Sequence, residues 1–76
     1  MPKLPVNLSG HDVVTAFSRL GYEADHQTGS HIILRQQKPP HRRLTVPNHK
    51  ILAKGTLRAI IKQAGLSRED FMALLK

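Results

Sequence analysis

The sequence predicts a small α+β domain, a three-stranded antiparallel sheet with helices packed on one face. Three observations support this fold: helical spacing of apolar residues near both ends, β-branched runs between turn residues in the middle, and a length of 76 residues, enough for one domain. The expected order is α-β-β-β-α with a short additional C-terminal helix, because that arrangement buries every apolar stripe. We expect a single domain over residues 1–76, with an N-terminal extension at 1–8, a core at 9–66 and the last helix within 67–76.

The first helix is predicted to begin after Ser9 and to end near Leu20, before Gly21. Asp12 lies three residues after Ser9, which is close to the capping-box arrangement that satisfies free amide groups at a helix start. Glycine favours a helix C-terminal cap. The apolar stripe of this helix consists of Val13, Val14, Phe17 and Leu20.

Three short strands are predicted in the middle of the chain. In residues 22–27, Tyr22 and every second residue after it alternate with the polar residues Glu23, Asp25 and Gln27. This period of two indicates a half-exposed strand. A turn at 28–30 leads into a β-branched strand at 31–35, so the two strands form a hairpin. Prolines in 38–41 mark a connecting loop, because proline lacks the amide hydrogen of a paired strand. A third strand follows at 43–46 and is ended by the next proline.

Helical spacing returns in the last third of the sequence. The apolar residues of the fifth element are Leu57, Ile60, Ile61 and Ala64, and Gly65 is placed to cap its end. Ser67 with Asp70 repeats the serine-acid spacing of a helix start. This spacing predicts a last short helix that carries Phe71, Met72, Leu74 and Leu75.

Positive charge is concentrated in one stretch. The chain has 12 Lys and Arg against 5 Asp and Glu, and residues 35–68 contain no carboxylate. This imbalance favours a polyanionic partner such as nucleic acid. Phe17 and Phe71 are expected in the core, which leaves Tyr22 as the one candidate for base stacking, so we expect phosphate contacts instead. The cations of this stretch are Arg35, Lys38, Arg42, Arg43, Lys50, Lys54, Arg58, Lys62 and Arg68.

Several function classes are excluded by residue types. The absence of cysteine excludes a disulfide scaffold, a Cys-ligated zinc site and a thiol nucleophile. No carboxylate occurs between Asp25 and Glu69 and no histidine pair has helical metal-site spacing, so we expect no metal and no cofactor. The sequence contains neither a long apolar run nor a secretory h-region, so we expect no membrane partner and a cytoplasmic location.

Five histidines are the side chains best suited to proton transfer near neutral pH. His11 is expected to be exposed in the first helical turn. His26 and His31 are expected at the facing ends of the hairpin, whereas His41 and His49 flank the third strand. His31 follows a glycine and a serine, and glycine lets a substrate backbone approach closely.

Three segments resemble the HicA toxin family. They are Gly29-Ser30-His31 opening a strand, Thr45-Val46-Pro47 ending the next, and residues 54–58 followed by 60–66. The resemblance implies a double-stranded-RNA-binding-domain-like fold and a ribosome-independent mRNA endonuclease. Such a protein is the toxin of a type II toxin-antitoxin system and is neutralised by a HicB-type antitoxin. The catalytic histidine of the family motif corresponds to His31.

The residues fit this chemistry. RNA carries its own nucleophile, the 2′-hydroxyl, so a histidine that removes its proton, with cations to stabilise the phosphoryl charge, suffices for cleavage. We expect His31 to be the general base and Arg35, four residues on along the same strand face, to hold the phosphate. The sequence does not identify the general acid, although His41 or His49 could serve. The candidate RNA-binding residues are Gly29, Ser30, Arg35, Lys38, Arg42, Arg43, Lys50, Lys54 and Arg58.

Two other functions remain open on the sequence. A non-catalytic RNA- or DNA-binding module would use the same basic surface and would retain RNA without cutting it. An interaction subunit that docks on an acidic protein would bind RNA negligibly.

Overall fold

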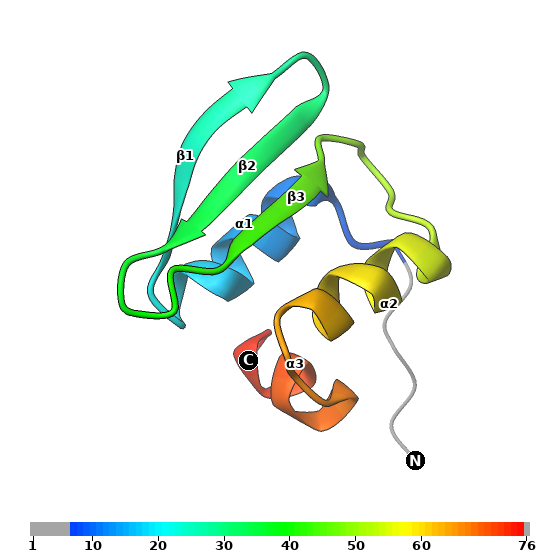
Figure 1. Cartoon of the computed structure of the whole chain (residues 1–76). Coiled ribbons are helices and arrows are strands. Elements are labelled where there is room, and N and C mark those ends of the chain that lie inside the picture. Colours follow the sequence, from blue (N-terminus) through cyan, green and yellow to red (C-terminus); the bar gives the residue numbers. More distant parts are fainter. Residues whose placement is uncertain (1–6, 76) are drawn as a thin grey trace.

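The computed structural model describes residues 7–75, so most of the expected extension at 1–8 lies outside the described residues. Six elements follow one another in the predicted order (Figure 1). They are α1 (Gly10–Ser18), β1 (Tyr22–Thr28), β2 (His31–Gln36), β3 (Arg43–Pro47), α2 (Lys54–Gln63) and α3 (Arg68–Leu74). The α+β class and the additional C-terminal helix are therefore confirmed.

The sheet is antiparallel with strand order β1-β2-β3. Helix α1 contacts β1 and β3 and passes behind the sheet in Figure 1, and α2 contacts β3. Helix α3 packs on α1 rather than on a strand. The core lies between the sheet and these helices, and its largest fully buried side chains are Phe17, Phe71, Leu34, Leu44, Leu57, Val13 and Val46.

The opposite surface of the sheet is here called the outer face. Ile32 and Leu34 on β2 are buried against the helices, as are Leu44 and Val46 on β3. Because side chains alternate along a strand, the residues between them point away from the helix layer. The outer face therefore carries His31, Ile33 and Arg35 of β2 with Arg43, Thr45 and Pro47 of β3.

Helix α1 begins as predicted and ends earlier. The Ser9 hydroxyl accepts a hydrogen bond from the Asp12 amide at 3.0 Å, and the Asp12 carboxylate accepts one from the Ser9 amide at 3.0 Å. The helix ends at Ser18, so Leu20 falls in the following turn and is 41% exposed. The prediction that Leu20 belongs to the buried stripe is wrong, and Ala16 is buried in that layer instead.

Strand β1 departs most from the predicted pattern. Only its first residue, Tyr22, is buried, and the other six are exposed. The Tyr22 ring packs edge-on against Phe17, with ring centroids 5.4 Å apart, and burial raises the pKa of its hydroxyl above the ordinary value. A bulge interrupts the pairing with β2 between Ala24 and His26. Beyond Tyr22 the strand is thus exposed on both faces, rather than half-buried as predicted.

Candidate functional site

His31 is the first residue of β2 and is exposed on the outer face. Its neighbours across the sheet are Thr28 on β1 and Pro47 on β3. The turn before it contains Gly29 at a φ of 57°, a conformation that favours glycine. A Cβ at Gly29 would meet no heavy atom within 4 Å, so the approach to His31 from this side is open.

Hydrogen bonds hold the backbone beside His31. The Asn48 amide donates to the Ser30 carbonyl at 2.6 Å, which ties the segment after β3 to the hairpin turn. The Gly10 amide donates to the His49 carbonyl at 2.9 Å. The start of α1, the hairpin turn and the segment after β3 therefore meet at one end of the sheet. This junction fixes the position of the exposed histidine.

The predicted RNA-binding cations fall on three parts of the molecule. Arg35 and Arg43 lie on the outer face, and the loops carry Lys38 and Lys50. On α2 the cations recur every four residues and form one exposed stripe, made of Lys54, Arg58 and Lys62. None of these side chains makes a hydrogen bond or ion pair with another residue of 7–75. These cations therefore make no ion pair within the described part of the chain, and one of them, Arg35, has Glu23 opposite it on β1.

Arg42 lies apart from this set. Its guanidinium donates a hydrogen bond to the Gln63 carbonyl at 3.2 Å, at the C-terminal end of α2. The same group lies 3.6 Å from where a Cβ on Gly65 would stand. A cation at this helix end satisfies a free carbonyl and suits the helix dipole. Arg42 thus caps α2, whereas Arg43 points to the outer face.

The other histidines differ in their distance from His31. His26 lies opposite Ile33 in the β1–β2 register, so it is on the outer face and diagonal to His31. The predicted facing position of His26 is wrong, because Thr28 occupies it. His26 Nδ1 lies 3.1 Å from an Asp25 carboxylate oxygen. Sequence reasoning missed this pair, since consecutive strand residues normally point to opposite faces.

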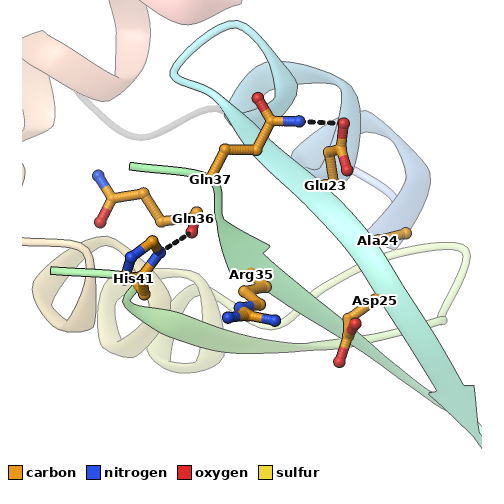
Figure 2. A pocket seen from close by; sticks show the side chains of 7 residues that line it. All are labelled: Glu23, Ala24, Asp25, Arg35, Gln36, Gln37 and His41. Atoms are coloured by element: carbon orange, nitrogen blue, oxygen red, sulfur yellow. Dashed lines mark hydrogen bonds between the residues drawn. The ribbon is translucent and has the colours of Figure 1, made fainter. Parts of the chain in front are cut away.

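His41 belongs to the opposite end of β2. It has a φ of 56°, and its Nδ1 lies 3.2 Å from the Gln36 carbonyl oxygen. His41 and Arg35 both line a hollow of about 380 Å³. Their side chains are drawn in Figure 2. The Gln37 amide donates to the Glu23 carboxylate across one side of the hollow. His31 does not line this hollow, so it acts from the open sheet surface if it acts on a substrate.

Comparison with known proteins identifies the family. A family model described as the HicA toxin of bacterial toxin-antitoxin systems matches residues 10–66. The chain belongs to the HicA toxin family. No curated protein matches the sequence. The match spans α1 through α2 and ends before α3, and it includes His31 and the junction beside it.

Membership of the HicA family makes this chain a toxin and implies an antitoxin partner. The order α1-β1-β2-β3-α2 fits the double-stranded-RNA-binding-domain-like fold expected from the resemblance. Tyr22 is 4% exposed, so this toxin cannot offer it as a base-stacking surface. Within residues 7–75, no three His, Asp or Glu side chains gather as a metal site would require. Over the same residues, no helix is long and apolar enough to cross a bilayer.

Proposed function

We propose that this HicA-family toxin is a ribosome-independent mRNA endonuclease whose general base is His31. The observation that carries the proposal is the position of this histidine. It is exposed on the outer face, at the start of a strand whose next outward cation, Arg35, makes no ion pair or hydrogen bond among the described residues. A long polyanion can therefore lie along β2 and contact both side chains.

The proposed reaction uses groups that RNA and this face supply. His31 takes the proton of a 2′-hydroxyl, and the resulting oxygen attacks the adjacent phosphorus. Cations near the phosphoryl oxygens stabilise the charge that develops in the transition state. Gly29 and Ser30 leave room for the ribose-phosphate backbone at the turn, since the space around Gly29 is open.

The cations without an ion pair are the proposed RNA contacts, and they lie on the outer face, in the loops and on α2. Phosphate contacts of this kind position RNA without reading its sequence. Arg42 is the exception among the residues expected from the sequence, because its guanidinium is engaged at the end of α2. The proposed phosphate ligands are Arg35, Lys38, Arg43, Lys50, Lys54 and Arg58.

The proposed inhibitor is a HicB-type antitoxin. The proposed location of the toxin is the cytoplasm, where it would meet both mRNA and the antitoxin. His31 and the outer-face arginines are exposed, so an inhibitor that neutralises the toxin must cover or compete for this face. Cations without an ion pair favour an acidic surface on that inhibitor. Reduced antitoxin affinity after removal of Arg35 or Arg43 would support this docking position.

The alternative is a non-catalytic RNA-binding module, which the same cations favour. The two functions differ in the fate of the RNA. Purified protein is mixed with a long mRNA in excess EDTA at a stated salt concentration, beside His31→Ala and a control, His11→Ala, in the exposed first turn of α1. Cleavage by the wild type and the control, with binding but no cleavage by His31→Ala, is the expected result. If all three proteins bind RNA and none cuts it, the binding module is correct.

Growth of expressing cells gives an independent readout. Expression of the wild type and of His11→Ala should arrest growth, and expression of His31→Ala should not. Equal melting temperatures for the three proteins exclude unfolding as the reason, because neither histidine is buried. Toxicity that persists in His31→Ala would contradict the catalytic assignment.

A further inference from the structure

A general base is half of the acid-base chemistry that RNA cleavage needs. The 5′-oxygen leaves as a strongly basic alkoxide unless it is protonated as the bond breaks, so a second group that donates a proton accelerates the step. Three other exposed histidines lie in the sheet or next to it in the sequence. They are His26 in β1, His41 before β3 and His49 after β3. Their positions on the fold separate them.

His26 shares the outer face with His31. It lies opposite Ile33, and His31 is two residues from Ile33 along β2. Residues in this diagonal relationship on one face of an antiparallel pair are about 7–8 Å apart. A phosphodiester between the two rings would meet one imidazole on the side of the 2′-hydroxyl and the other on the side of the 5′-oxygen.

Asp25 holds the His26 ring. Its Oδ2 lies 3.1 Å from Nδ1 of His26, which fixes this nitrogen as a donor and leaves Nε2 directed to other partners. Two consecutive strand residues meet in this way because the register shifts between Ala24 and His26. Bulges occur beside active sites, where they redirect a side chain. The two side chains are 37% and 54% exposed, so substrate can reach the pair.

The other histidines fit the role less well. His41 follows the far end of β2, and its Nδ1 contacts the Gln36 carbonyl oxygen there. His49 lies beyond Pro47, the neighbour of His31 on β3, but no carboxylate among the described residues orients its ring. His26 alone combines the outer face, a diagonal position next to His31 and a carboxylate partner within residues 7–75.

The geometry points to His26, positioned by Asp25, as the general acid of the cleavage reaction. This assignment rests on the proposed endonuclease function. His31 takes the 2′-hydroxyl proton while the 2′-oxygen forms a bond to phosphorus. The bond from phosphorus to the 5′-oxygen breaks, and His26, as an imidazolium with protons on both nitrogens, gives its Nε2 proton to that oxygen. The products are a 2′,3′-cyclic phosphate and a 5′-hydroxyl, and proton exchange with water restores both rings.

A substrate that needs no acid tests this assignment. At one mapped cleavage site, an RNA oligonucleotide is compared with the same oligonucleotide carrying a bridging sulfur in place of the 5′-oxygen, because a thiolate leaves without protonation. His26→Gln should slow cleavage of ordinary RNA by about 10²- to 10⁴-fold. On the sulfur substrate it should cleave within a few-fold of the wild type. His31→Ala should fail on both substrates. His11→Gln, in the exposed first turn of α1, is the control and should behave as the wild type. His49→Gln tests the competing candidate for the acid and should show no selectivity between the substrates.

Asp25 acts through His26, so its variant should show the same selectivity with a smaller loss. Asp25→Asn should slow cleavage of ordinary RNA by about tenfold and leave the sulfur substrate unaffected, by analogy with carboxylates that orient metal-bound histidines. In His26→Gln, the fall of the rate at high pH, which reports the general acid, should disappear.

Each contrary outcome has a distinct meaning. Wild-type rates for His26→Gln on ordinary RNA, or equal losses on both substrates, would overturn the assignment of the acid while leaving the endonuclease intact. Selective loss in His49→Gln instead would transfer the role to that residue and overturn the assignment as well. If the wild type cleaves neither substrate, the endonuclease function itself fails, and the role of His26 fails with it.

Discussion

Arg35 and Arg43 lie directly opposite each other on β2 and β3, with both side chains on the outer face. Like charges in this position destabilise a sheet. Neither guanidinium makes an ion pair or hydrogen bond among residues 7–75, although Glu23 lies opposite Arg35 on β1. A phosphate bound between them would remove this repulsion. The pair therefore leaves the outer face able to hold an anion between the two guanidinium groups, next to the Glu23 carboxylate.

Removal of one of these two positive charges should weaken RNA binding without lowering the free energy of unfolding. Arg43→Gln, made in the non-cleaving His31→Ala background, should weaken single-stranded RNA binding and lower the slope of log affinity against log salt by about 0.7. The free energy of unfolding should stay equal or rise by about 0.2–1 kcal/mol, since a like-charge pair is lost. Fluorescence titration at several salt concentrations and urea unfolding measure the two quantities. An unchanged salt slope would exclude Arg43 from the phosphate contacts.

Arg42, next to Arg43 in the chain, supplies the matched control, because its loss should reduce stability and leave RNA binding unchanged. Arg42→Gln should lower the free energy of unfolding by about 1 kcal/mol, because the Gln63 carbonyl loses its donor at the end of α2. The salt slope of RNA binding should not change. A variant that kept full stability and lost RNA affinity would show that Arg42 binds phosphate after all.

The α1 cap should make stability sensitive to acid. Hydrogen bonds from the backbone and the side chain of Ser9 hold the pKa of Asp12 below its ordinary value of 3.8. Because the folded pKa is the lower one, this carboxylate stabilises the fold above pH 3.8 and loses its effect as the pH falls through the folded value. Asp12→Asn should therefore melt below the wild type at pH 7, and the gap should narrow below pH 3.8. A gap that is constant with pH would contradict this origin.

Gly10 should tolerate no side chain. A Cβ at this position would stand 2.3 Å from the Pro47 carbonyl oxygen. This oxygen belongs to the backbone, so it cannot move aside as a flexible side chain could. Gly10→Ala should lower the free energy of unfolding by about 1–3 kcal/mol, since the start of α1 and the segment after β3 must separate. Gly55→Ala is the control, because nothing lies within 4 Å of its Cβ position. Equal melting temperatures of the two variants would contradict the close approach.

The features that could be predicted from the sequence depend on residues close in the chain. Each serine cap pairs residues that are three positions apart, so the spacing in the sequence is enough to predict it. Ser9 with Asp12 and Ser67 with Asp70 both form capping boxes in the structure. The buried pattern of β2 follows from β-branched and leucine side chains at alternate positions. The family motif gave His31 its candidate role for the same local reason.

The features that could not be predicted depend on pairing between distant segments. The shift of register between Ala24 and His26 is set by the fit of β1 to β2, and it decides where His26 points. The sequence gives no reason to expect different roles for the adjacent Arg42 and Arg43. In the structure, Arg42 donates a hydrogen bond to the Gln63 carbonyl at the end of α2, 21 residues away in the chain. The early end of α1 likewise turned Leu20 outward.

The contact at Gly10 should also widen the set of substitutions that inactivate this toxin. Cells selected for survival after the antitoxin is withdrawn accumulate inactivating mutations, and a catalytic residue offers a small target for them. The junction of Gly10, Ser30 and Asn48 beside His31 enlarges that target, since any side chain at Gly10 displaces the segments that hold the histidine. Sequencing of survivors should recover Gly10 substitutions alongside those of His31. The close packing beside His31 should therefore make the toxin easy to inactivate by mutation.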